Sequence, residues 1–235
     1  MLKLLKMKHK KINSLITPTS WNDINCGMYY RQTLEQGLQY WWPKLFGFYL
    51  LKIGSLSIEL DTKTCAISHQ VNVGFNCKNL QVIANPDALP FANKSTDACL
   101  LAHTLSYHSN PHRQLSEVDR VLINDGWLIL TTFNLISILG MINVCPFLVR
   151  NHQFRSRMFT KMRLLNWLSE LNFEVVHYMS LKTLFSQYKN ILHTNYSNIG
   201  CLNIIIARKR TIPLNFTLIK HPFQVTLKPY LFHNN

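Results

Sequence analysis

The most regular pattern of apolar and polar positions begins with residues 98–102, which are apolar at every position and bounded by polar residues. A short run of this kind is typical of a strand that is buried on both faces. After a polar loop, Asn110 has the form of a helix N-cap, and Pro111 suits the first helical position because proline lacks the N–H that is not needed there. Apolar residues then recur at helical spacing as far as Leu122, so the pattern predicts a strand followed by a helix.

The same helix is followed by a second strand. Asp125-Gly126 predicts a turn, and residues 127–133 are again an apolar run. Arg113 and Glu117 lie four residues apart on the helix, which predicts an ion pair on its outer side. Strand, helix and strand in this order form a βαβ unit, and such units predict a parallel sheet with helices on its faces.

Further elements are expected on both sides of this unit. One helical pattern consists of Tyr30, Leu34, Leu38 and Trp41. Another consists of Met158, Met162, Leu165 and Leu168, with Asn172 as a left-handed C-cap. The remaining strands are expected at 48–53, at 65–68 or as far as 73, and at 80–84, 173–178 and 202–207.

Residues of the central region resemble a known family. The residues on which the resemblance rests are Leu89-Pro90-Phe91, Ser95, Asp97, His103, Pro111, Leu115, Glu117, Arg120-Val121-Leu122 and Gly126. In this arrangement they resemble the second half of a class I S-adenosylmethionine (SAM)-dependent methyltransferase domain of methyltransferase type 11. Over 21–213 the chain is similar to the uncharacterised enterobacterial YafS-like members of that family. The resemblance implies an α/β, Rossmann-like class I methyltransferase fold, with a largely parallel seven-stranded sheet, helices on both faces, an antiparallel last strand, and SAM as the cofactor.

The first cofactor motif departs from the family pattern. The family ends its first strand with an acidic residue and a Gly-x-Gly turn, because glycine lets the backbone approach the methionine part of SAM. Here Lys52 stands at the acidic position and Leu56 at the second glycine, while Gly54 is retained and followed by Ser55. Either the site is rebuilt around Gly54 and Ser55, or it is no longer a tight SAM site.

Further cofactor contacts are implied by the resemblance. His69 stands where the family has an acid that binds the ribose hydroxyls, and a turn residue is the alternative reading of it. Asn85 follows the third strand, where its carbonyl can accept from the adenine amino group. Asp87, Ala88 and Leu89 are expected beside the adenine, although a loop Asp often caps its own turn.

Two histidines follow the fourth strand. Ligands of open α/β sheets bind beyond the carboxyl ends of the strands, so His103 and His108 are expected beside the transferring methyl group. A histidine suits the removal of a proton from an acceptor near neutral pH. His103 is the first candidate for a catalytic base and a cofactor contact, and His108 is the second candidate base. A structural role is the alternative for both.

Length and composition are those of one globular domain. The chain has 235 residues, of which 47% are hydrophobic. The domain is expected at 21–212, between a basic, flexible N-terminal tail at 1–20 and a loosely ordered C-terminal tail at 213–235. Six cysteines form no CxxC pair, which favours reduced thiols in a cytoplasmic protein without a metal site.

The charge of the chain leaves a second class of function open. The net charge is +14, which attracts polyanions such as RNA, but no RNA-binding motif accompanies it, and base-composition drift also explains it. SAM-dependent methyl transfer to a small-molecule or anionic acceptor is the first reading. The alternative is a non-catalytic methyltransferase-fold protein that binds RNA or a protein partner.

One long uncharged stretch, 127–149, needs a separate account. Polar residues interrupt it and its first part is the predicted strand, so no transmembrane span is expected, although association with a membrane surface is a third reading. A loop over the acceptor side is favoured instead. Arg150, Arg155 and Arg157 follow it and suggest an anionic acceptor if they lie beside that loop; a solvated basic surface is the alternative.

Overall fold

The computed structural model describes residues 17–24, 26–75, 79–135, 156–181 and 200–210. Its helices are η1 (Trp21–Asp23), α1 (Gly27–Gln39), η2 (Trp42–Lys44), α2 (Ser55–Glu59), α3 (Thr104–Tyr107), α4 (Pro111–Val121) and α6 (Lys161–Glu170). Its strands are β1 (Tyr49–Ile53), β2 (His69–Gly74), β3 (Val82–Ile83), β4 (Thr96–Ala102), β5 (Leu122–Phe133), β6 (Phe173–Leu181) and β7 (Leu202–Lys209).

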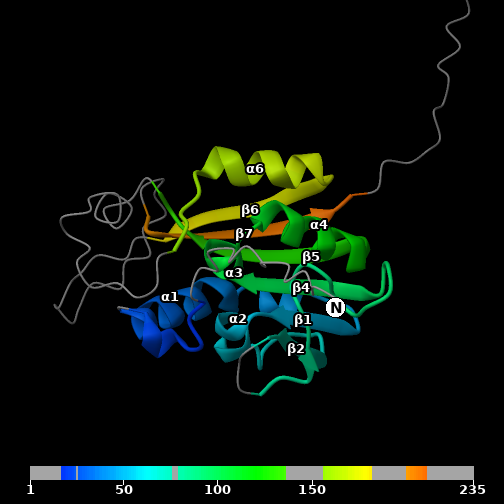
Figure 1. Cartoon of the computed structure of the whole chain (residues 1–235), viewed down its shortest axis with the longest axis horizontal. Helices are drawn as coiled ribbons and strands as arrows, with labels where there is room; N and C mark the ends of the chain where they lie inside the picture. Colours follow the sequence, from blue (N-terminus) through cyan, green and yellow to red (C-terminus); the bar gives the residue numbers. More distant parts are fainter. Residues whose placement is uncertain (1–16, 25, 76–78, 136–155, 182–199, 211–235) are drawn as a thin grey trace, which may run out of the picture.

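The seven strands form one sheet in the order β3-β2-β1-β4-β5-β7-β6 (Figure 1). Strands β1 to β5 pair with one another in parallel, whereas β7 runs antiparallel to both β5 and β6. The predicted βαβ unit is β4, α4 and β5. The predicted α/β fold with a largely parallel seven-stranded sheet and an antiparallel last strand is therefore confirmed.

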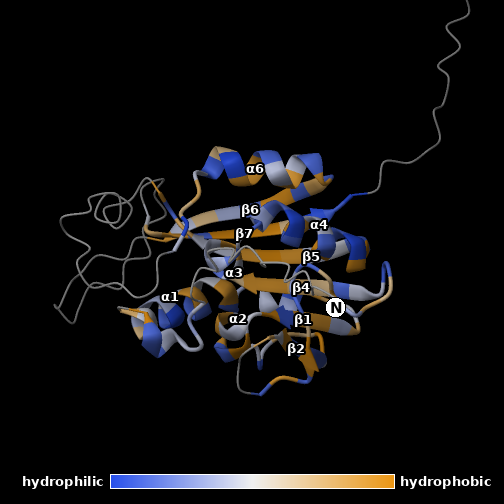
Figure 2. Ribbon diagram, viewed as in Figure 1, coloured by the Kyte–Doolittle hydropathy of each residue, from blue (hydrophilic) through white to orange (hydrophobic). Residues whose placement is uncertain are grey.

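Each face of the sheet has its own apolar core. On one face Leu34 and Leu38 of α1 pack with Leu50 of β1, and on the other Leu115 of α4 and Leu164 of α6 pack with apolar residues of β4, β5 and β7. Strand β4 contributes alternate residues to both cores, which explains why its sequence is apolar at every position. Figure 2 shows the central strands as hydrophobic, while α4 and α6 carry hydrophilic residues as well.

Three local predictions differ from the structure. The second strand is His69–Gly74, so its placement at 65–68 was wrong; Ile67 is buried from the preceding loop instead. Helix α6 begins after Thr160, whose side chain accepts from the Arg163 N–H, and this start leaves Met162 exposed. The buried residues of α6 are Leu164 and Leu168, so Leu168 of the predicted face is confirmed, whereas Leu165 is only partly buried.

The predicted ion pair on α4 is also different. Glu117 Oε1 lies 2.7 Å from Arg120 Nη2, one turn further along, and not beside Arg113. The N-cap prediction is confirmed, because the Asn110 side chain accepts from the Arg113 N–H at 3.2 Å. Asn172 has a φ of 58°, as expected of a left-handed residue after a helix.

The ends of the chain are described in part. Pro18 is buried and Ser20 caps η1, so residues 17–20, assigned from the sequence to the N-terminal tail, pack on the domain. Residues 136–155 and 211–235 lie outside the described residues, and Arg150 and Arg155 with them. Among the described residues, no helix is long and apolar enough to span a membrane.

Candidate functional site

The carboxyl ends of β1 and β4 lie side by side at the point where the strand order reverses, which is where open α/β sheets bind ligands. Gly54 follows β1 with a φ of +87°, a conformation that favours glycine. A Cβ added to Gly54 would lie 3.0 Å from two side-chain atoms of Thr104, and the Thr104 hydroxyl donates to the Ile53 carbonyl at 2.9 Å. The turn after β1 therefore requires the retained glycine and is fastened to the start of α3.

This turn is covered by the chain's own N-terminal segment, residues 17–24. Trp21 is fully buried, and its indole N–H donates to the Leu56 carbonyl at 3.0 Å. The Ser55 hydroxyl donates to the Pro18 carbonyl at 2.5 Å, and Glu59 Oε2 accepts from the Trp21 backbone N–H at 3.1 Å. We call residues 17–24 the cover segment, because they occupy the space over Ser55 and Leu56.

Lys52, at the acidic position of the family, is directed away from this turn. Its side chain is buried, and its Nζ donates to the Leu60 carbonyl at 3.1 Å and to the Thr62 hydroxyl at 3.2 Å. Burial lowers the pKa of Lys52, because the charged amine is removed from water. The lysine fastens the loop after α2 and does not present its charge to the crevice.

His103, the first candidate base, ends β4 in a left-handed conformation with a φ of 52°. Its ring stacks on Phe133 at 4.1 Å between centroids and meets the edge of Trp21 at 5.4 Å. It is fully buried, neither ring nitrogen has a hydrogen-bond partner, and burial lowers its pKa to about 3. In this conformation the imidazole is neutral and enclosed, so it cannot reach an acceptor.

The loop after β3 holds the residues that the resemblance places beside the adenine. Asn85 is exposed, and its Oδ1 accepts from the Asp87 N–H at 3.0 Å, so it is Asn85 that caps this turn, whereas the alternative had assigned that role to Asp87. Ala88 is exposed as well, whereas Leu89 is buried and its N–H donates to Glu117 Oε1 at 2.7 Å. The outer side of this loop is open to a ligand.

Arg120 and Glu117 position that loop, a role that sequence reasoning missed. Arg120 donates from Nη2 to the Leu89 carbonyl and from Nη1 to the Phe91 carbonyl, both at 3.0 Å. Hydrogen bonds from Arg120 hold the pKa of Glu117 below its usual range. The family motifs at 89–91 and 117–122 are thus in contact with each other. Their joint occurrence in the sequence is the signal that could have predicted this contact.

His108, the second candidate base, lies beside the same loop. Its Nδ1 accepts from the Asn110 N–H at 3.1 Å, which assigns the proton of the neutral ring to Nε2. Nε2 lies 3.5 Å from Asp87 Oδ1. His108 is therefore held in one orientation between the loop after β3 and the start of α4.

His69 does not belong to this group. It begins β2 and pairs with Tyr49 at the start of β1, with the two rings 5.6 Å apart. Because β1 and β2 are parallel, this is the edge of the sheet opposite Gly54. The expectation that His69 ends the second strand and contacts the ribose is wrong, since it rested on placing that strand too early.

The structure thus brings the remaining candidates into two neighbouring groups. Gly54, Ser55 and His103 meet at the ends of β1 and β4, and the loop of residues 85–89 meets His108 beside them. The resemblance places the adenine of SAM beside the second group, whereas Trp21 and Leu56 fill the first, where the family binds the methionine part of SAM. Across the described residues, no group of three or more His, Cys, Asp or Glu side chains could hold a metal ion.

Comparisons with known proteins agree with this geometry. The family described as "Methyltransferase domain", methyltransferase type 11, matches residues 49–130. The chain is 48% identical over 209 residues to the uncharacterised protein YafS of Escherichia coli K12, covering 88% of this chain and 87% of YafS.

Solved structures of low identity share the fold. A SAM-dependent methyltransferase from Thermotoga maritima is 19% identical with a TM-score of 0.53, over 81% of this chain and 99% of its own. One from Archaeoglobus fulgidus is 15% identical with a TM-score of 0.55, over 76% of this chain and 94% of its own. Together with the match to YafS, these findings show that the chain belongs to the methyltransferase type 11 family of class I methyltransferases.

Proposed function

We propose that the chain is a SAM-dependent methyltransferase whose cofactor crevice is closed, in the conformation described, by its own cover segment. The observation that carries the proposal is the turn at Gly54. Its positive φ and its contact with Thr104 preserve a close backbone approach at the switch point of the sheet. Packing of the sheet alone does not require a positive φ at this position, because a residue in an ordinary conformation could also connect β1 to α2.

Opening of the crevice requires only a local change. The hydrogen bonds between the cover segment and the α2 region join Pro18, Ser20 and Trp21 to Ser55, Leu56 and Glu59, which belong to α2 and not to the sheet. Their release would free the Ser55 hydroxyl and the backbone beside Gly54 for the ligand. SAM supplies the methyl group on a sulfonium, and alignment of the acceptor with exclusion of water supplies much of the catalysis.

The two histidines would then differ in role. Movement of Trp21 exposes His103 to water, which returns its pKa toward the ordinary value and makes it a base for an acceptor that must lose a proton. His108 Nδ1 accepts from the Asn110 N–H and Nε2 lies 3.5 Å from Asp87 Oδ1, so His108 acts as a positioning residue for the loop of residues 85–89. His103 is therefore the proposed base.

A second candidate function is supported by the first motif. Lys52 and Leu56 replace the residues that the family uses there, and Trp21 is packed as tightly as a core residue. A non-catalytic domain that binds RNA or a protein partner would retain this closed state permanently. The two candidates differ in whether SAM binds at all.

Calorimetric titration of SAM into the full chain separates them. Saturable binding that is weakened by Asp87→Ala, with S-adenosylhomocysteine as a competitor, supports the enzyme. Asp61→Ala is the matched control, since it removes an exposed carboxylate from a different loop. Absence of heat at millimolar SAM, from protein with a cooperative melting transition, would refute the enzyme and favour the binding module.

A further inference from the structure

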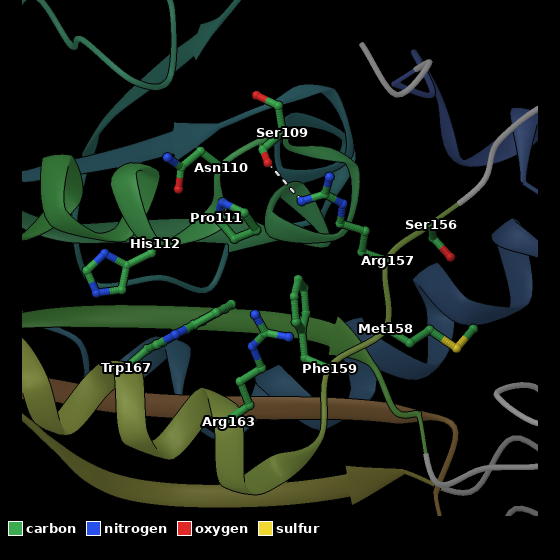
Figure 3. A pocket seen from close by; sticks show the side chains of 10 residues that line it. All are labelled: Ser109, Asn110, Pro111, His112, Ser156, Arg157, Met158, Phe159, Arg163 and Trp167. Atoms are coloured by element: carbon green, nitrogen blue, oxygen red, sulfur yellow. Dashed lines mark hydrogen bonds between the residues drawn. The ribbon is translucent and has the colours of Figure 1, made fainter. Parts of the chain in front are cut away.

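A second hollow, of about 850 Å³, lies between α4 and α6 at the amino end of α4 (Figure 3). It is separate from the crevice at Gly54, on the face of the sheet that α4 and α6 cover. The lining residues that matter for its chemistry are Ser109, His112, Arg157, Phe159, Arg163 and Trp167. A volume of this size is within the range of small-molecule sites.

The hollow has an excess of cationic groups. Arg157 and Arg163 line it, and no carboxylate is among its lining residues. Glu170, on the same helix as Arg163, lies 3.2 Å from His112 Nε2 and is thereby paired. Arg157 and Arg163 form no ion pair with a described carboxylate.

Most of the other described arginines are paired with a carboxylate. Each of four others lies within 4 Å of a carboxylate, namely Arg31, Arg120, Arg208 and Arg210. Arg113 is also without such a partner, but it does not line the hollow, so Arg157 and Arg163 are the unpaired arginines of the described chain that lie together there. They present charge-assisted donors that an anion could accept.

Both guanidinium groups are held in place by neutral contacts. Arg157 donates from Nη1 to the Ser109 carbonyl at 2.8 Å and from its backbone N–H to the Ser106 carbonyl at 2.7 Å. The guanidinium of Arg163 lies over the Trp167 ring, 4.8 Å from its centroid. Figure 3 shows Arg163 extending from α6 between Trp167 and Phe159. Most of their N–H donors remain available.

We propose that this hollow binds the phosphate group of a small phosphorylated molecule, and that this molecule is the methyl acceptor. A guanidinium is a planar fork that matches phosphate oxygens, and the aromatic residues Phe159 and Trp167 supply an apolar wall for the rest of the molecule. The hollow is a local site bounded by α4 and α6, which favours a small phosphoester over an RNA strand, because RNA needs a continuous basic groove.

The chain segment between β4 and α4 links the hollow to the crevice. Ser106 and Ser109, which hold Arg157, belong to the segment between β4 and α4 that also contains His108. An acceptor anchored by its phosphate would thus lie beside the loop that follows His103. This assignment as acceptor rests on the proposed methyltransferase function, whereas phosphate binding does not.

The test is calorimetric titration of inorganic phosphate and of glycerol 3-phosphate into the full chain at constant ionic strength. Saturable binding of both is expected. Arg157→Gln and Arg163→Gln should each weaken it at least about tenfold, because each removes charge-assisted hydrogen bonds to the anion. Arg113→Gln is the matched control, since Arg113 lies on α4 without lining the hollow, and it should leave the affinity unchanged.

Two results would overturn the proposal. One is equal weakening by all three substitutions, which would show a response to net charge alone. The other is a uridine 12-mer that binds more tightly than glycerol 3-phosphate and is weakened equally by Arg113→Gln, which would indicate an RNA-binding surface. Titration of SAM into the wild-type chain is run separately, so that loss of phosphate binding and failure of the methyltransferase proposal remain distinguishable.

Discussion

Glu59→Ala should open the crevice without disturbing the sheet. Glu59 Oε2 accepts from the Trp21 N–H at 3.1 Å and from the Ser20 hydroxyl at 3.2 Å, and both contacts are partly buried. Hydrogen bonds to charged groups contribute about 1.5 to 3 kcal/mol each, and partial exposure favours the lower end. A combined loss of about 3 kcal/mol for the closed state would raise the open fraction roughly 150-fold.

The apparent affinity for SAM should rise by a factor of up to that size, because the ligand no longer works against the closed state. Calorimetric titration measures the affinity, and hydrogen exchange of the Trp21 indole N–H measures opening directly. Glu174→Ala is the matched control: it removes a carboxylate that contacts Arg210 at the far edge of the sheet and should change neither quantity. Faster exchange at Trp21 with an unchanged SAM affinity would show that the cover segment does not oppose the cofactor.

Three further predictions concern buried polar groups. Because the pKa of His103 is lowered to about 3, the unfolded chain binds one more proton than the folded chain below pH 6.5. The free energy of unfolding should therefore fall as the pH is lowered from 6.5 to 5. His103→Phe should reduce this dependence on pH by up to about 1.4 kcal/mol per pH unit, as measured by urea titrations. Arg120→Gln should lower the free energy of unfolding by about 2 to 3 kcal/mol and weaken SAM binding, because it removes the hydrogen bonds to the Leu89 and Phe91 carbonyls. Arg113→Gln should have neither effect. Equal melting temperatures of the two variants would contradict a role of Arg120 in holding this loop. Lys52→Asp, which restores the acid of the family, should destabilise the fold by about 3 kcal/mol or more, because a carboxylate would face the Leu60 carbonyl, while Lys52→Met should be tolerated within about 2 kcal/mol.

The sequence predicted those elements whose pattern is set by burial on a defined face. Strand β4 lies in the middle of the sheet, so its apolar run was unambiguous, and Asn110 with Pro111 marked the start of α4. Strand β2 was misplaced because its residues are only partly buried, while Ile67 in the loop before it is fully buried. Hydrophobicity therefore indicated the wrong segment, and the error in His69 followed from it.

The candidate site was predictable in its positions but not in its contacts. Lys52 and Leu56 were identified as departures from the family, yet the direction of the Lys52 side chain depends on where the loop at 60–62 lies. The contact of Trp21 with His103 joins residues far apart in the chain, and no periodic pattern reports such a pair. The sequence shows that aromatic residues are frequent near the N-terminus, but it does not show which residues they contact.

The departures in the first motif form one connected arrangement, which bears on how they arose. Leu56, in place of a glycine, is buried in the same core cluster as Trp21, whose indole donates to the Leu56 backbone carbonyl, and the neighbouring Ser55 binds Pro18. Lys52, in place of an acid, is buried with two acceptors at Leu60 and Thr62. Random decay of a motif would be expected to leave a buried amine without partners, at a cost of several kcal/mol. The satisfied lysine and the matching cover segment support the proposal of a crevice rebuilt around closure.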